Sequence, residues 1–285
     1  MKILITGSRG QLGSSLRREF DTDPDIEAIY TDYDTLDITN HDAVERFLGD
    51  HKFDVIVNCA AYTAVDKAET DEISASTLNT GAVGNLAEAA AKHGSRVIHI
   101  STDYVFSGQG FRPYEENDEP YPQCIYGRTK LEGEALLTSF CQDSMIIRTA
   151  WLYSEFGNNF VKTMLGLADS KPEINVVADQ IGTPTYAGDL ARAIHTIIRS
   201  GKWTPGIYHY TDEGVASWYD FAKAIFEMTG KRVKVTPVRT SAYPTPAIRP
   251  LYSVLSKNKI KNAYGLEIPY WRDSLKECVA ALGKA

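Results

Sequence analysis

The sequence predicts an α/β protein with a Rossmann-type, doubly wound parallel sheet and a smaller C-terminal lobe. Short apolar runs alternate with longer amphipathic stretches over the first 150 residues, and a glycine-rich turn follows the first apolar run. Strands that alternate with helices form right-handed βαβ units, which build a parallel sheet. Proline becomes frequent after Trp151. The chain is therefore divided into 1–150 and a more irregular part, 151–285, from which some segments are expected to return to the sheet.

Each expected element follows from its own apolar pattern, with short runs assigned to strands and longer periodic stretches to helices. The strands expected are 2–6, 27–32, 55–59, 96–101, 144–148 and 174–177. The helices expected are 11–20, 41–48, 74–93, 125–140, 159–168, 189–199 and 218–228.

The composition excludes several classes of protein. Hydrophobic residues make up 43% of 285 residues, which suits a sizeable core, and the net charge of −7 argues against a nucleic-acid partner. No apolar run approaches the about 20 residues that span a bilayer, and the start does not resemble a signal peptide. Because the four cysteines form no CxxC pair, we expect reduced thiols and a cytoplasmic protein without a membrane partner.

The glycine-rich turn, Gly7-Ser8-Arg9-Gly10-Gln11-Leu12-Gly13, joins the first expected strand to the first expected helix. Glycines allow a tight turn and a close approach to a pyrophosphate, while the helix N-terminus offers free N–H groups. The GxxGxxG spacing resembles that of extended short-chain dehydrogenases. The position of this turn predicts that 1–150 is a dinucleotide-binding domain.

Two side chains near this turn favour different nicotinamide cofactors. Asp32 ends the second expected strand, where an acid can bind the ribose 2′-hydroxyl of NADH. Arg9 can instead face the 2′-phosphate of NADPH, so both cofactors stay open. Asp37 can contact the adenine or simply cap a turn.

The sequence Tyr126-Gly127-Arg128-Thr129-Lys130 places a phenol and an ammonium on one face of an expected helix. A nearby ammonium stabilises phenolate and lowers the pKa of a tyrosine, which otherwise lies near 10. Ser101 and Thr102, at the end of the preceding strand, compete to hydrogen-bond a substrate carbonyl. Tyr104 either lines the pocket or packs in the core.

The six histidines are scattered, without the HxH or HExxH spacing of a zinc site. They are His41, His51, His93, His99, His195 and His209. We therefore expect no metal.

Nearly the whole chain resembles the dTDP-4-dehydrorhamnose reductase family of extended short-chain dehydrogenases. The resemblance rests on GSRGQLG from Gly7, NCAAYTAVDKAE from Asn58, STDYVFSG from Ser101, YGRTKLEGE from Tyr126, RTAWLYSEFGNNFVKTM from Arg148, VVADQIGTPT from Val176, SWYDFA from Ser217 and AIRP from Ala247. It implies reduction of the C4 ketone of dTDP-4-dehydro-L-rhamnose by NADH or NADPH, in the synthesis of dTDP-rhamnose for cell-surface polysaccharide.

The resemblance also assigns roles to individual residues. Tyr126 would donate the proton, Lys130 would lower the Tyr126 pKa and hold the ribose, and Thr102 would supply the hydroxyl. The implied cofactor contacts are Gly7, Arg9, Gly10, Gln11, Leu12, Gly13, Asp37, Ile38, Ala60, Ala61, Tyr62, Tyr126 and Lys130. The implied substrate contacts are Thr102, Asp103, Tyr104, Trp151 and Arg249. Arg249 suits a diphosphate, although it can also be a surface residue that stabilises the loop before Pro250.

One departure from the family and two alternatives bear on this prediction. Some members are magnesium-bridged dimers that use an acid on the first helix, where this chain has Ser14-Ser15. We therefore expect no metal here and leave a homodimer open. Another nucleotide-sugar epimerase or reductase is one alternative function, and the single acid Asp103 argues against a dehydratase. The other is a non-catalytic regulatory subunit similar to the beta subunit of methionine adenosyltransferase.

Overall fold

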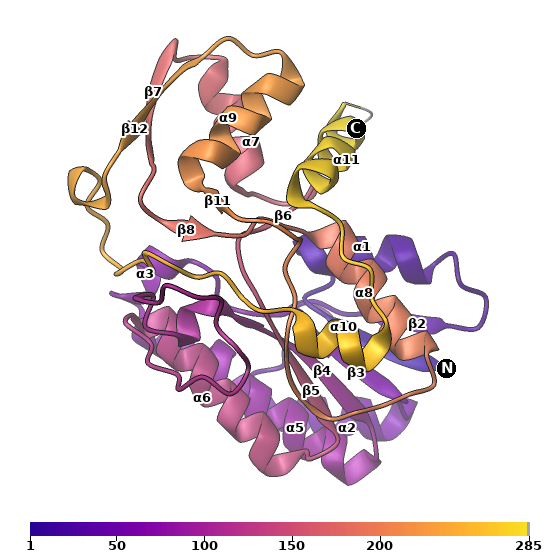
Figure 1. Ribbon diagram of the computed structural model, residues 1–285. Helices are drawn as coiled ribbons and strands as arrows, with labels where there is room; N and C mark the ends of the chain where they lie inside the picture. Colours follow the sequence, from indigo (N-terminus) through magenta and orange to yellow (C-terminus); the bar gives the residue numbers. More distant parts are fainter. Residues whose placement is uncertain (284–285) are drawn as a thin grey trace.

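A six-stranded sheet, all of whose strand pairs are parallel, forms the centre of the molecule, a computed structural model that describes residues 1–283 (Figure 1). The strand order is β10-β5-β4-β3-β1-β2. The strands are β1 Lys2–Thr6, β2 Glu27–Tyr30, β3 Val55–Asn58, β4 Arg96–Thr102, β5 Ser144–Thr149 and β10 Gly206–His209. The predicted fold class is confirmed, although β10 was not expected.

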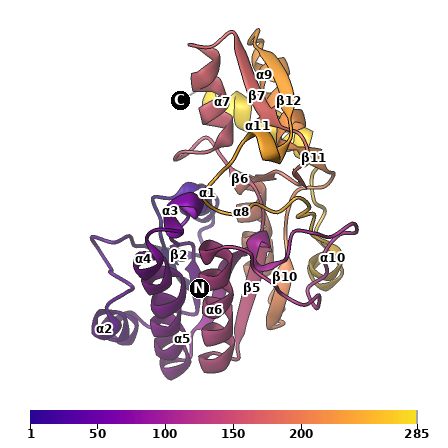
Figure 2. The ribbon, with the colours of Figure 1, turned by 90° about the vertical axis from the view of Figure 1, so that its left-hand side faces the viewer.

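Helices cover both faces of this sheet, so its strands are buried on both sides (Figures 1 and 2). One layer contains α2 His41–His51, α5 Ala82–His93 and α6 Ile125–Phe140. The other contains α1 Gln11–Phe20, α8 Ala187–Arg199 and α10 Asn258–Tyr264. The alternating side chains of β1 explain the two layers. Leu4 packs in the core beneath the first layer, while Ile3 and Ile5 point to the other face and pack in the core beneath the second layer.

The prediction of one continuous α-helix over 74–93 is wrong. The structure has α4 Glu72–Ser76, a π-helical turn Thr77–Gly81 and then α5. In the turn, Asn79 forms two hydrogen bonds with the backbone of Tyr62, at 2.8 and 3.1 Å. Asn79, within the π turn, thus ties the helix to the chain that follows β3, and π turns are frequent at functional sites.

The second lobe surrounds an aromatic core of its own, in which Phe221 packs against Tyr153, Phe160 and Trp271. Its helices are α7 Phe160–Ala168, α9 Trp218–Thr229 and α11 Trp271–Leu282. Its paired strands are β7 Glu173–Val177 with β12 Lys234–Val238, β8 Ile181–Gly182 with β11 Ala216–Ser217, and β6 Leu152–Tyr153 with β9 Thr185–Tyr186.

The lobe is not one continuous stretch of chain. α8 packs on α1, and β10 pairs with β5, so 187–209 belongs to the sheet and its layers. The apolar face of α8, with Leu190, Ile194 and Ile197 almost fully buried, requires this position against the sheet. The end of the expected second part, at residue 285, lies outside the described residues.

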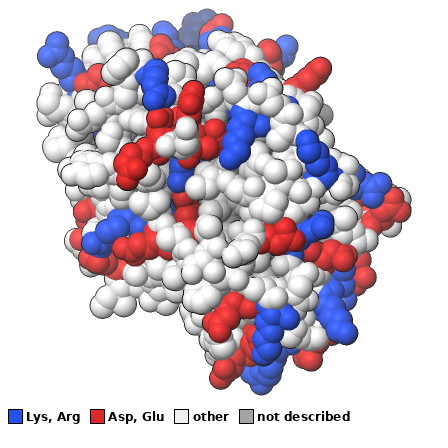
Figure 3. Space-filling view, turned by 60° about the horizontal axis from the view of Figure 1, so that its bottom comes forward, with Lys and Arg blue, Asp and Glu red and all other residues white. Residues whose placement is uncertain are grey.

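Charged side chains of both signs lie close together on the face shown in Figure 3, where Lys and Arg alternate with Asp and Glu. Across residues 1–283, none of the helices is both long and apolar enough to cross a membrane.

Candidate active site

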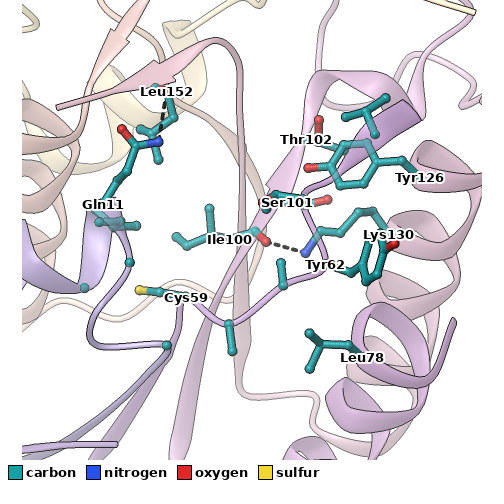
Figure 4. A pocket seen from close by; sticks show the side chains of 18 of the residues that line it. Gln11, Cys59, Tyr62, Leu78, Ile100, Ser101, Thr102, Tyr126, Lys130 and Leu152 are labelled. Atoms are coloured by element: carbon teal, nitrogen blue, oxygen red, sulfur yellow. Dashed lines mark hydrogen bonds between the residues drawn. The ribbon is translucent and has the colours of Figure 1, made fainter. Parts of the chain in front are cut away.

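A cleft of about 1020 Å³ opens at the carboxyl ends of the central strands, facing the second lobe (Figure 4). Its position follows from the strand order, which reverses beside β1, because ligands of open parallel sheets bind at such points. The predicted site residues that line it are Gly7, Gly10, Gln11, Leu12, Gly13, Asp37, Ile38, Ala60, Ala61, Tyr62, Thr102, Asp103, Tyr104, Tyr126, Lys130, Trp151 and Arg249. Arg9 is the predicted residue that does not line it.

The glycine turn, which can cradle a ligand, packs so closely against neighbouring backbone that side chains at Gly7 and Gly13 would collide with it. Gly7 has φ +64°, and a Cβ there would lie 2.7 Å from Ala60 Cα. A Cβ on Gly13 would lie 2.5 Å from Ser8 Cα. Helix α1 follows with Gly10 as its N-cap, without a capping side chain or an acid in its first turn. These bare N–H groups fit the pyrophosphate of a dinucleotide.

Arg9 lies outside the cleft in a cluster of opposite charges. Its guanidinium pairs with Asp34 at 2.6 Å and with Asp32 at 3.4 Å, while its backbone N–H donates to Asp32 Oδ2 at 3.1 Å. Hydrogen bonds from Arg9 and Tyr33 lower the pKa of Asp32 against the opposing effect of burial. The carboxylate of Asp32 therefore lies in the loop just after β2, which ends at Tyr30, beside a guanidinium that is already paired.

Two expected cofactor residues use their side chains to hold the protein together. The Gln11 amide donates to Leu152 O at 3.3 Å and accepts from Asn159 Nδ2 at 2.9 Å, so it joins α1 to the second lobe. Asp37 accepts from the backbone N–H and hydroxyl of Thr39, at 3.0 and 2.6 Å. This is the turn that the sequence left open as an alternative for Asp37.

Tyr126 lies in the first turn of α6 and packs edge-on against Tyr104, with ring centres 5.5 Å apart. Gly127 makes this possible, because a Cβ there would lie 2.2 Å from Tyr104 O. Burial raises the pKa of Tyr126, and a hydrogen bond with Thr102 acts in the opposite direction. The direction is opposite to the lowering that the sequence predicted, because desolvation of the phenolate outweighs the other influences.

Lys130 lies one turn further along α6 and is almost fully buried. Its side-chain nitrogen lies 2.7 Å from Ile100 O (Figure 4). The same nitrogen lies 3.1 Å from His99 Nε2. Burial lowers the pKa of Lys130 to about 8. His99 was not among the predicted site residues. The sequence signal for it is that Val97, His99 and Ser101 alternate on β4 and so share one face.

The two competing hydroxyls at the end of β4 have different partners. Ser101 donates to Glu134, which forms a buried ion pair with Arg148 at 2.6 Å. Thr102 interacts with Tyr126 and donates to Asp103 Oδ1 at 3.0 Å. The structure thus leaves Thr102 as the hydroxyl beside the phenol.

Asp103 is buried next to the catalytic candidates, and burial raises its pKa to about 6. Its Oδ2 has no hydrogen-bond partner among residues 1–283. A buried carboxyl with a free oxygen can accept a hydrogen bond from a hydroxyl-rich ligand.

The opposite wall of the cleft comes from the second lobe and its connections. Trp151 has φ +49° and stacks on Trp218, with ring centres 3.6 Å apart. Trp218, which the sequence analysis did not single out, also lines the cleft. Arg249 donates to Tyr104 Oη at 3.1 Å and to Asp66 Oδ2 at 2.6 Å.

Comparisons with known proteins agree with this geometry. The family model described as RmlD substrate binding domain matches residues 1–284. A dTDP-4-dehydrorhamnose reductase of Aggregatibacter actinomycetemcomitans is 45% identical over 96% of this chain and 97% of the relative. The chain belongs to the dTDP-4-dehydrorhamnose reductase family. The resemblance stated from the sequence motifs is confirmed.

Solved structures of the dTDP-4-dehydrorhamnose reductase family share the fold closely. That from Clostridium acetobutylicum has a TM-score of 0.96 and 46% identity, covering 99% of this chain and 100% of its own. That from Bacillus anthracis, in complex with NADP, has a TM-score of 0.94 and 39% identity, covering 98% and 99%. Among the described residues, no three His, Cys, Asp or Glu side chains are grouped to hold a metal.

Proposed function

We propose that the chain reduces the C4 ketone of dTDP-4-dehydro-L-rhamnose to dTDP-L-rhamnose with NADH or NADPH, for cell-surface polysaccharide. The observation that carries this proposal is the meeting of Thr102, Tyr126 and Lys130 on one wall of a cleft that also contains the glycine cradle. The expected cytoplasmic location and the open homodimer belong to the same proposal.

Tyr126 donates the proton that the ketone oxygen needs. A bound reduced nicotinamide supplies hydride to the keto carbon. Because burial raises the pKa of Tyr126, the phenol is protonated at neutral pH and ready to act as an acid. The Thr102 hydroxyl hydrogen-bonds the same oxygen and stabilises the charge that develops on it.

Lys130 stabilises the phenolate that Tyr126 becomes after this transfer. The phenolate lies one helical turn from Lys130, whose positive charge stabilises it. The same side chain is positioned to hold the cofactor ribose, since it lines the cleft that also contains the glycine turn.

Arg249 binds the diphosphate of the substrate in this proposal. Its contacts with Tyr104 and Asp66 orient the guanidinium and leave other N–H donors free for phosphate oxygens. The stacked Trp151 and Trp218 provide a flat wall for the sugar.

The test is turnover of the purified protein with dTDP-4-dehydro-L-rhamnose and each reduced cofactor. Stoichiometric oxidation of the cofactor, with dTDP-L-rhamnose identified by NMR, is the expected result. An isomerised sugar without net cofactor oxidation would indicate an epimerase. Cofactor binding without any turnover would favour the regulatory-subunit alternative.

A further inference from the structure

A row of buried polar side chains runs beneath the cleft from β1 to α6. It consists of Thr6, Asn58, His99 and Lys130, each at most 2% exposed. Thr6 Oγ1 lies 2.7 Å from Asn58 Oδ1, Asn58 Nδ2 lies 3.0 Å from His99 Nδ1, and His99 Nε2 lies 3.1 Å from Lys130 Nζ. Protons in such a row cannot be distributed freely, because each contact needs one donor and one acceptor.

The orientation of Asn58 is fixed by the backbone. Ala60 N–H, which can only donate, points to Asn58 Oδ1 at 3.2 Å. The other end of the amide, Nδ2, therefore faces His99 and donates to Nδ1. His99 Nδ1 accepts this bond and is unprotonated.

The proton of His99 must then lie on Nε2. Burial lowers the pKa of His99 well below its ordinary value, so the imidazole is neutral and carries one proton. This Nε2–H points at Lys130 Nζ. An ammonium has three donors and no lone pair, whereas a neutral amine can accept.

We propose that Asn58 and His99 act as positioning residues that favour the neutral amine of Lys130, and that the amine takes up a proton when Lys130 turns to the cofactor and Tyr126. The proton comes from solvent and binds the Nζ lone pair, and the hydrogen bond from His99 breaks. The role in turnover rests on the proposed reductase function. Cofactor binding alone is sufficient to drive the change.

The other groups that face Lys130 are compatible with this assignment. Glu134, on the same helix, favours the ammonium, but its carboxylate is engaged by Arg148 and Ser101. Cys59, which follows β3, is a neutral thiol, because burial raises its pKa to about 12. Tyr126 is a neutral phenol for the same reason. His99 thus makes the hydrogen bond that selects the amine.

Nitrogen NMR of the histidine side chains reads the tautomer directly. We expect His99 to be protonated at Nε2 and bare at Nδ1, with its signal identified by its loss in His99→Gln. Its Nε2 resonance should move as Lys130 titrates near pH 8 and should stop doing so in Lys130→Met. A proton found on Nδ1 of His99 in the wild-type protein overturns the proposal.

Calorimetry of cofactor binding in buffers of different ionisation enthalpy measures the proton uptake. Above pH 8 we expect uptake of about one proton per bound cofactor in the wild type, and none in Lys130→Met. His99→Gln should take up less, because its side-chain carbonyl accepts from an ammonium and keeps Lys130 charged before binding. A His99→Gln protein with weaker binding but unchanged uptake would show a merely structural role and contradict the proposal. The calorimetry contains no sugar, so it does not depend on turnover. A protein that takes up the proton on binding cofactor but does not reduce the keto sugar in the separate assay would overturn the reductase function and leave this proposal standing.

Discussion

At the scale of single residues, the raised pKa of Tyr126 determines which step it can perform. We expect Tyr126→Phe to lower kcat by about a hundredfold to ten-thousandfold, since it removes the proton donor and little volume. Cofactor affinity, measured by fluorescence titration, should stay within about twofold of the wild type. A near-normal rate in this variant would remove Tyr126 from the mechanism.

The charges around Arg9 predict a preference between the two cofactors. Asp32 and Asp34 together outweigh Arg9, so the 2′-phosphate of NADPH meets a net negative cluster. We expect a higher kcat/KM with NADH, and we expect Asp32→Ser to shift the ratio about tenfold toward NADPH. The matched control is Asp32→Ser combined with Arg9→Ala, in which the gain should disappear. An unchanged ratio in Asp32→Ser would contradict this explanation.

At the scale of elements, the sequence predicts best where local signals coincide. The bounds of α1 and α6 agree with the structure, since each follows a strand or loop and has apolar residues at helical spacing. The paired strands of two residues, such as β6 and β9, were missed because they are too short to show periodicity. β10 was missed because only its pairing with β5 defines it.

The same difference, between local sequence signals and contacts made only in the folded chain, applies to the candidate site. The glycine turn and Tyr126-to-Lys130 spacing are local patterns, so they can be read from the sequence. The Asn58–His99 and His99–Lys130 contacts join residues 41 and 31 positions apart. Only the parallel pairing of β3 with β4, which places Asn58 opposite His99, brings them together. The stacking of Trp151 on Trp218 depends likewise on the folded lobe.

The attachment of α6 to β5 depends on the buried ion pair between Glu134 and Arg148. We expect Arg148→Met to lower the free energy of unfolding by about 3 kcal/mol, because it leaves Glu134 buried without its partner. The measurement is urea unfolding at pH 7. Combining it with Glu134→Leu should recover most of the loss, since a matched apolar pair carries no desolvation cost. If the double variant is less stable than Arg148→Met, the explanation is wrong.

At the scale of the whole molecule, the cleft exists because two groups of elements are joined at several points. Gln11 joins α1 to the strand β6, and Arg18 on the same helix pairs with Glu155. Arg249 of the second lobe pairs with Asp66, which follows β3. These contacts flank the cleft, so its width is determined by the junction and not by either part alone.

A pair of carboxyls at this junction makes the stability of the molecule depend on pH. Asp212 follows β10, and Asp189 lies in the first turn of α8. Both also interact with Ser274 of α11. One oxygen of each has no partner among residues 1–283. Burial, and then the charge of Asp189, raise the pKa of Asp212 well above its ordinary value.

The sign of the effect follows from the two states. Below about pH 4, Asp212 is protonated in both the folded and the unfolded chain, and it costs no stability. As the pH rises, the unfolded chain releases the proton first, so the folded state loses stability until the pH reaches the raised pKa.

We therefore expect Asp212→Asn to increase the free energy of unfolding by about 2 kcal/mol at pH 7, with the gain shrinking toward pH 4. Urea unfolding over this pH range measures it. Asp189→Asn is the matched control and should gain less, because it weakens the pairing with Arg192. A gain in Asp212→Asn that does not change with pH would mean that packing, and not the buried charge, limits the junction.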